Sequence, residues 1–282
     1  MRLARFTAAD DVPRWGVVDL GAEKIQPVLG RIAEWAPELI ASGFTTVPAQ
    51  GGPLALADVR LLAPVEETAK ILGTGMNYWS HLERLGRTER PRSLTSFIKP
   101  RTAVIGPDDE IRNPALTEQL DYEVELVAVI GDQVTPMTDD AVPALLGYTV
   151  GNDVSARDQR NELGPDLVSM KSLDATTPIG PWITTVDELG TPADLDVTIR
   201  CRVNGAVRQE DTTKRMLWPV TEILDFFRVR ISMAPGDVVF TGTTCGVGLE
   251  DGRFLRAGDV LETDIDGIGT LRNIVGVHGA RG

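Results

Sequence analysis

Acidic residues occupy every second position where one apolar segment begins, since Asp121, Glu123 and Glu125 precede the apolar residues 126–130. In a β-strand, side chains two residues apart point to the same face, so these carboxylates would crowd together and repel one another. A divalent cation relieves such repulsion, and oxygen-only ligands favour Mg²⁺, Mn²⁺ or Ca²⁺ over zinc. An edge strand with a solvated acidic face is the alternative that this segment alone leaves open.

A further acid, Asp153, lies in a polar loop that follows the strand-like segment 147–151. Loops at strand ends commonly carry functional groups, so Asp153 is a candidate third carboxylate. The same Asn-Asp-x-Ser pattern also begins turns and caps helices. This loop, taken alone, therefore supports either interpretation.

The chain has only two histidines, His81 and His278. His81 follows the Gly-rich segment 73–75, whereas His278 lies near the C-terminus and outside every motif. A catalytic imidazole, if the reaction uses one, is therefore predicted to be His81. The stretch from Arg84 to Arg92 contains four arginines, a glycine and a proline. We predict that it forms a mobile lid that binds an anion, with an ordinary solvated loop as the alternative.

A Thr- and Gly-rich loop, residues 241–248, follows the apolar segment 238–240. Its backbone N–H groups and hydroxyls, including that of Thr243, could bind a carboxylate or an oxyanion. The loop lacks the lysine and the spacing of a Walker A motif, and no helical pattern follows it, which argues against a dinucleotide fingerprint.

The composition narrows the classes of partner. The 282 residues include 28 Lys and Arg against 41 Asp and Glu, a formal net charge of −13, which argues against a nucleic-acid partner. No stretch has the length and apolarity of a membrane span, and the N-terminus lacks the apolar segment of an export signal. The two cysteines, Cys201 and Cys245, fit a reduced compartment. We therefore expect a soluble, cytoplasmic protein without a membrane partner.

The elements that must position these residues are mostly strands. Segments with strand-like composition are separated by Gly, Pro, Asn and Asp, at residues 70–72, 96–99, 124–130, 195–203, 238–241 and 260–265. Helical spacing is found at residues 27–41, 141–146 and 219–227, and Asn204-Gly205 predicts a two-residue hairpin turn. The pattern predicts a strand-rich α/β fold without the rhythm of a doubly wound sheet. An opening hairpin and helix are assigned to a small N-terminal domain of residues 1–64, and residues 65–282 to the main domain.

Taken together, these segments resemble the fumarylacetoacetate hydrolase superfamily from about residue 65 to Ile274. The resemblance rests on Asn77-Tyr78 with His81, Phe97-Ile98-Lys99-Pro100, Asp121 to Leu126, Gly147-Tyr148 with Asn152 to Asp158, Lys171-Ser172 with Asp174, Val203-Asn204-Gly205, and Pro235-Gly236-Asp237 through Thr243. It implies a mixed β-roll with a small N-terminal domain, assembled as a homodimer.

The resemblance also implies roles for individual residues. Glu123, Glu125 and Asp153 correspond to carboxylates that bind Mg²⁺ or a similar ion, His81 to the catalytic histidine, and Lys171 to a lysine beside metal and substrate. The candidate substrate-binding residues are Tyr78, Arg84, Lys99, Arg157, Arg160 and Thr243.

Two positions depart from the family pattern. Hydrolytic members often carry Glu three residues after the histidine, but Arg84 stands there. Glu83 is the remaining candidate partner of His81, although a helical lid would direct Glu83 elsewhere and leave the histidine without an orienting carboxylate. Arg160 stands where members often carry Gln, which predicts a pocket altered to hold a second carboxylate.

The function implied is that of an enzyme acting on a small 2-oxo or diketo acid through an enolate that the metal stabilises. The leading prediction is hydrolysis of a C–C bond in an acylpyruvate or 2,4-diketo acid. The alternative is decarboxylation or tautomerisation of a 2-oxo or 2-hydroxy-diene dicarboxylic acid, such as oxaloacetate or a homoprotocatechuate-pathway intermediate of aromatic catabolism. Arg84 favours this alternative without displacing the first. A non-catalytic binding protein is a remote third possibility, against which the intact triad argues.

Overall fold

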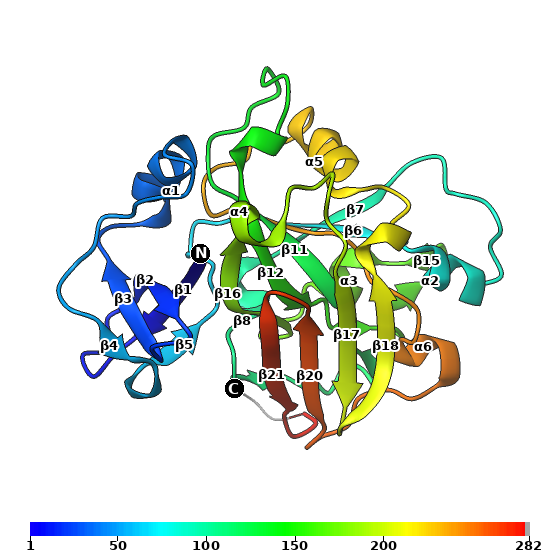
Figure 1. The fold of residues 1–282 in the computed structure, drawn as a ribbon. Coiled ribbons are helices and arrows are strands. Elements are labelled where there is room, and N and C mark those ends of the chain that lie inside the picture. The colour runs from blue at the N-terminus through cyan, green and yellow to red at the C-terminus, as the bar shows by residue number, and fades with distance from the viewer. Residues whose placement is uncertain (280–282) are drawn as a thin grey trace.

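The structure is a computed structural model that describes residues 1–279 (Figure 1). Two β-sheets form its framework, one of twelve strands and one of five. Figure 1 shows the N-terminal strands and α1 beside the main body, and the five-stranded sheet over the large sheet. The strand-rich α/β architecture predicted from the sequence is therefore confirmed.

The large sheet has the strand order β4-β3-β2-β1-β16-β12-β11-β19-β6-β7, with β5 beside β1 and β8 beside β16. Its strands are β1 (Arg2–Thr7), β2 (Arg14–Asp19), β3 (Lys24–Val28), β4 (Leu54–Ala55), β5 (Arg60–Leu62), β6 (Ile71–Gly75), β7 (Thr95–Lys99), β8 (Val104–Ile105), β11 (Val124–Ile130), β12 (Leu145–Asn152), β16 (Thr177–Thr185) and β19 (Val238–Phe240).

The smaller sheet has the order β18-β17-β20-β21-β9. Its strands are β9 (Glu110–Ile111), β17 (Thr198–Val203), β18 (Ala206–Thr212), β20 (Val260–Ile265) and β21 (Gly269–Val275). Two short pairs complete the strands: β10 (Leu120–Asp121) with β13 (Ser155–Ala156), and β14 (Arg160–Asn161) with β15 (Gly164–Pro165).

The helices are short and lie between the strands. They are α1 (Ile32–Ala41), α2 (Trp79–Arg84), α3 (Leu167–Lys171), α4 (Val186–Leu189), α5 (Val220–Arg228) and α6 (Gly248–Asp251), with 3₁₀ turns at Leu56–Asp58, Arg101–Ala103, Val142–Ala144 and Thr213–Arg215. Within residues 1–279, none of these helices has the length and apolarity needed to cross a membrane.

Most of the predicted elements are present. The opening hairpin forms from β1 and β2, and the predicted strands 124–130 and 260–265 match β11 and β20. Asn204 and Gly205 join β17 to β18 with φ values of 52° and 78°, the positive angles that a two-residue hairpin turn requires.

The helix predicted at residues 141–146 is wrong. Val142–Ala144 form only a 3₁₀ turn, and Leu145 begins β12, all of whose residues are buried. A strand that is covered on both faces has a continuous apolar run, which spacing alone does not distinguish from a buried helix. The helix predicted from residue 27 begins later, at Ile32, because Pro27 and Val28 belong to β3.

Strand β11 lies in the interior of the large sheet, between β12 and β19, and all its residues are buried. Leu126 and Ala128 belong to the core cluster that also contains Ile199 and Leu261 of the smaller sheet. The alternate residue Val127 packs in a second cluster, on the opposite face. Packing on both faces makes β11 a rigid support for any group at its beginning.

The N-terminal strands continue the large sheet, because β1 pairs with β16 at Arg2↔Thr184 and Leu3↔Ile183. The buried carboxylate of Glu66 connects this region to the main body. It accepts hydrogen bonds from Trp15 Nε1 at 2.9 Å and from the backbone N–H of Ile32 at 3.0 Å.

Candidate active site

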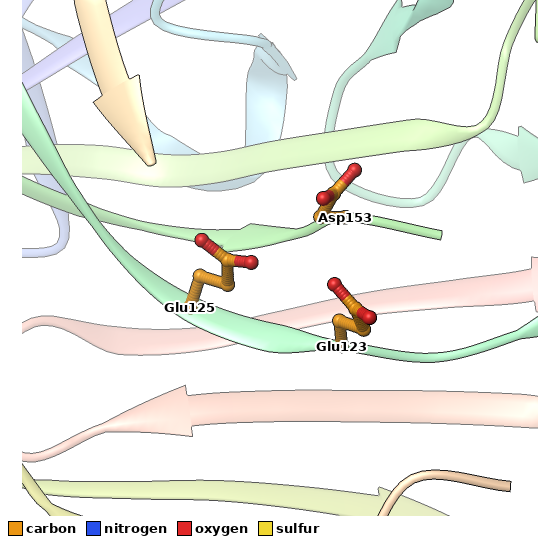
Figure 2. A group of neighbouring side chains, drawn as sticks. All are labelled: Glu123, Glu125 and Asp153. Carbon is orange, nitrogen blue, oxygen red and sulfur yellow. The ribbon is translucent and has the colours of Figure 1, made fainter. Parts of the chain in front are cut away.

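Three buried carboxylates meet where β11 begins and β12 ends. Ligand atoms of Glu123, Glu125 and Asp153 all lie within 4.8 Å of one another, and Figure 2 shows the side chains of Glu123 and Glu125 extending toward Asp153. Val124 pairs with Asn152 across β11 and β12, which places Asp153 beside the two glutamates. The backbone N–H of Asp153 also donates to the Glu123 carbonyl at 2.9 Å.

Three cationic side chains that the sequence singled out surround these acids. Lys171 Nζ donates to Glu123 Oε2 at 2.7 Å and also to Asp153. Lys99 Nζ donates to Asp153, and Arg157 donates to Glu123. All three cations are buried, so their charges act on the acids through a medium of low polarity.

These charges act unequally on the two glutamates. Burial raises the pKa of Glu123, but Arg157, Lys171 and, to a smaller extent, His81 outweigh burial and lower this pKa to about 2. Burial and the charges of Asp153 and Glu123 raise the pKa of Glu125 well above its ordinary value, because Lys171 offsets only part of these effects. Glu125 is therefore the acid whose negative charge is least compensated.

The same carboxylate has a free oxygen. Glu125 Oε2 accepts a hydrogen bond from the Gly242 backbone N–H at 2.6 Å, while Oε1 is buried and has no partner among residues 1–279. A buried carboxylate oxygen without a partner is costly unless a donor or a cation satisfies it. Three converging carboxylates with one unsatisfied oxygen fit a hard divalent cation such as Mg²⁺, Mn²⁺ or Ca²⁺.

Tyr78 and Thr243, two candidate substrate-binding residues from the sequence, differ in whether their hydroxyls are free to bind a substrate. Tyr78 is fully buried, and its hydroxyl has no partner within the described part of the chain. Burial, with smaller effects of Glu125 and Asp211, raises its pKa, so the phenol stays protonated and can donate. The Thr243 hydroxyl, by contrast, donates to the Val124 carbonyl at 2.9 Å and accepts from Gln209 at 2.8 Å. Its position therefore supports strand β11.

His81 has a carboxylate partner that the sequence did not reveal. Its Nδ1 lies 3.0 Å from Glu250 Oε1, and both side chains are at least nine-tenths buried. The expectation that His81 lacks an orienting carboxylate is therefore wrong. Glu83, the candidate named from the sequence, has a side chain that is 64% exposed and lies 3.5 Å from Arg215. Helix α2 directs Glu83 away from the site, as helical spacing from His81 requires.

No local pattern indicated Glu250. It belongs to the four-residue helix α6, where we expected no helix, and 169 residues separate it from His81. The backbone N–H of Gly246 donates to its other oxygen, Oε2, at 2.9 Å. The one available signal was an acid placed seven residues after Thr243, just beyond the loop of residues 241–248 that was already assigned to the site.

The two arginines that depart from the family pattern are both exposed. Arg84 ends α2 and lines a groove of 710 Å³ together with Glu250, but neither His81 nor any of the three carboxylates lines this groove. Arg160 lies in β14, within the hairpin that β15 completes. The lid from Arg84 to Arg92 stays a prediction, although Arg90 contacts Glu222 at 2.8 Å.

Sequence comparison reveals relatives over nearly the whole chain. The chain is 38% identical to Protein Rv2993c of Mycobacterium tuberculosis, over 98% of both chains. It is 33% identical to the mitochondrial oxaloacetate tautomerase fahd2 of Xenopus laevis, over 98% of this chain and 90% of the relative. It is 34% identical to 2,4-didehydro-3-deoxy-L-rhamnonate hydrolase of a Sphingomonas species, over 92% and 91%.

A solved structure shares the fold. The 5-carboxymethyl-2-hydroxymuconate delta-isomerase of Mycobacterium smegmatis is 33% identical and superposes with a TM-score of 0.80, over 98% of this chain and 100% of that one. This likeness confirms the mixed β-roll with an N-terminal domain. The family profile described as Rv2993c-like, N-terminal, matches residues 1–64, and the profile described as Fumarylacetoacetate (FAA) hydrolase C-terminal matches residues 70–276. The chain therefore belongs to the fumarylacetoacetate hydrolase superfamily.

Proposed function

We propose that this chain is a divalent-metal-dependent hydrolase that cleaves a C–C bond in an acylpyruvate or a related 2,4-diketo acid. The observation that carries the proposal is the contact between His81 and Glu250 beside the carboxylate triad. Arg84 stands where hydrolytic members often carry an acid that orients the histidine, which disfavours hydrolysis. Glu250 supplies such an acid from another part of the chain, so this objection no longer applies. A hydrolase, an isomerase and a tautomerase all occur among the similar proteins, so each of these three reactions is a candidate activity for this chain.

Glu123, Glu125 and Asp153 would hold the ion. Bound there, Mg²⁺ or Mn²⁺ would supply Lewis-acid stabilisation of the negative charge that develops on the oxygens of a 2-oxo acid. Lys171 stays protonated, because Asp153 and Glu123 raise its pKa against the opposing effect of burial. Its charge balances the triad and favours an anionic substrate nearby.

His81 is assigned the proton transfer. A carboxylate only accepts hydrogen bonds when ionised, so Glu250 selects the imidazole tautomer that carries its proton on Nδ1. Nε2 is then left as a base. It would take a proton from water as the water oxygen attacks the distal carbonyl carbon, and the C–C bond would then break to release the enolate of pyruvate, which a proton converts to pyruvate.

Tautomerisation of a 2-oxo dicarboxylic acid such as oxaloacetate is the second candidate. The names of the Xenopus relative and of the Mycobacterium smegmatis structure support it, and so does the chemistry of the site. The same Nε2 would move a proton between carbon and oxygen, with no water added and no bond between carbons broken. Arg84, which is exposed at the end of α2, three residues after His81, could contact the second carboxylate of such a substrate.

One comparison separates the two candidates. The purified protein with Mg²⁺ is given acetylpyruvate in one assay and the enol of oxaloacetate in another. Hydrolysis yields pyruvate from acetylpyruvate, detected with lactate dehydrogenase, whereas tautomerisation is seen as loss of enol absorbance without pyruvate. Turnover of oxaloacetate enol alone would replace our first proposal with the second. Turnover of neither would refute both for these substrates.

The oligomeric state and the domain boundary are further proposals. We propose a homodimer, on the family resemblance, and a domain boundary between residues 64 and 65. Sedimentation equilibrium that gave only the 30.5 kDa species would contradict the dimer.

A further inference from the structure

Asp121 begins the alternating acidic pattern but is not part of the carboxylate triad. Regular pairing stops between β10, which ends at Asp121, and β11, which begins at Val124. The Asp121 carboxylate instead accepts hydrogen bonds from the backbone N–H groups of Gly248 at 2.6 Å and Leu249 at 3.0 Å. These are the first two residues of α6, the helix that carries Glu250.

Helix α6 needs such an anchor, because a single helical turn is not stable by itself. The approach to Asp121 is close: a Cβ placed on Gly248 would lie 2.7 Å from Asp121 Oδ1 and 2.6 Å from the Arg253 carbonyl oxygen. Only glycine therefore fits at this position without displacing the helix. The hydrogen bonds donated by the backbone of Gly248 and Leu249, together with the missing side chain of Gly248, fix where α6 begins. They thereby fix the position of Glu250 on this helix.

Arg157 extends this anchor to the metal side of the site. Its Nε donates to Asp121 Oδ2 at 2.8 Å, and its guanidinium also donates to Glu123. The two side chains are almost fully buried, at 0% exposure for Asp121 and 6% for Arg157. Buried charge-assisted hydrogen bonds of this kind hold both partners in one geometry.

We propose that Asp121 is a positioning residue, which joins the triad, through Arg157, to helix α6 and thereby holds Glu250 against His81. Within residues 1–279, the hydrogen-bond partners of the Asp121 carboxylate are the backbone N–H groups of residues 122, 248 and 249 and the Arg157 guanidinium, and Asp121 is not a member of the triad. Its effect on the reaction is therefore indirect and passes through the orientation of the imidazole. The catalytic consequence rests on the proposed function, but the geometric claim does not.

A kinetic test measures this consequence. Asp121→Asn should lower kcat for the identified substrate about as much as Glu250→Gln does, and the double variant should lose little more than either single variant. Non-additivity is the signature of residues that act through one group. Additive losses would show that Asp121 acts independently of Glu250 and would overturn the proposal.

The second test needs no substrate, so its result is independent of the proposed function. The tautomer of His81 is read from long-range ¹H–¹⁵N spectra of the full chain at a pH where imidazole is neutral, with His278 as the internal reference. The wild type should show the Nδ1–H tautomer at His81. Asp121→Asn and Gly248→Ala should both lose it.

The matched control is Asp237→Asn. Asp237 is also buried and accepts from two backbone N–H groups, those of Lys70 at 2.7 Å and Ala234 at 2.8 Å, and from the Lys70 ammonium at 2.9 Å. It precedes β19, whereas the site lies beyond the other end of that strand. We expect Asp237→Asn to lower the stability of the fold and to keep the Nδ1–H tautomer at His81.

If Asp121→Asn does not fold, the His81 tautomer in Gly248→Ala is the deciding measurement. A wild-type His81 signal in every folded variant, or equal loss in Asp237→Asn, would overturn the inference.

Discussion

The imidazole Nδ1 of His81 and the carboxylate Oε1 of Glu250 lie 3.0 Å apart, although 169 residues separate them in the chain. One residue comes from a helix after β6, and the other from a helix after the Thr- and Gly-rich loop that follows β19. Strands β6 and β19 are parallel neighbours, so their ends bring these two helices together. The fold therefore supplies a pair that no sequence spacing encodes.

The pair predicts how two variants differ. His81→Ala should lower kcat by a factor of about 10² to 10⁴, the usual contribution of general acid–base catalysis. Glu250→Gln should lower it by roughly a hundredfold, because the imidazole stays in place but loses its fixed orientation. Steady-state kinetics measures both, and calorimetry should show Mg²⁺ affinity unchanged. A Glu250→Gln enzyme with the wild-type kcat would refute the orienting role.

The Arg84→Glu variant tests whether His81 already has a carboxylate partner, by adding a second acid near it. If His81 lacked a partner, an acid three residues later would raise hydrolytic activity. Because Glu250 already occupies Nδ1, we expect no gain in kcat and a higher KM, since the end of α2 loses a positive charge that attracts an anionic substrate. The measurement is kcat and KM for acetylpyruvate, with Arg87→Glu as the control for charge alone. A higher kcat in Arg84→Glu would mean that Glu250 does not serve His81.

Glu125→Gln should abolish most of the Mg²⁺ affinity, by about a hundredfold or more, because the ion loses one of three charged ligands. Isothermal titration calorimetry measures the effect directly. The control is Glu262→Gln, on β20 of the smaller sheet and outside the triad. Equal affinity in wild type and Glu125→Gln would exclude the triad as the binding site.

The stability of the metal-free protein should depend on pH through the same residue. The pKa of Glu125 is raised in the folded chain, so between its ordinary value near 4.5 and the raised value the unfolded chain ionises first. Folding stability is therefore lost as the pH rises through this interval. In EDTA, Glu125→Gln should melt at a higher temperature than wild type at pH 8, and the difference should shrink toward pH 5.

Saturating Mg²⁺ should reverse that order, because ion binding stabilises only a chain that keeps the ligand. The melting temperature of the wild type should rise, and that of Glu125→Gln should change little. If wild type were the more stable chain in EDTA at pH 8 as well, the raised pKa of Glu125 would be contradicted.

The triad was accessible from the sequence because its signal is local. Glu123 and Glu125 stand two residues apart before an apolar strand, and Asp153 directly follows the strand that pairs with it. Period two is a property of any β-strand, so spacing alone predicts their common face. Asp121 obeys the same spacing and yet serves α6, because the strand is interrupted at Tyr122 and Glu123, before β11 begins, and spacing does not reveal this interruption.

Other features depended on tertiary structure. Glu250 lies on a helix too short to carry a periodic pattern, and only its neighbours in space give it a role. The apolar residues that begin β12 were read as a helix because both faces of that strand are covered. The missed role of Glu250 and the wrong helix at the start of β12 have the same origin. The sequence pattern indicates which residues are buried, but it does not indicate which other elements they pack against.

The pairing of β1 with β16 also bears on solubility. The backbone groups of Ile183 and Thr184 that would otherwise face water are hydrogen-bonded to the N-terminal strand. An unpaired edge is a template on which further chains can add as strands and aggregate. A chain without its first 64 residues would expose this edge of the catalytic sheet and become prone to self-association. By this argument the N-terminal strands would cap the sheet and protect the chain against aggregation, although they lie outside the carboxylate triad.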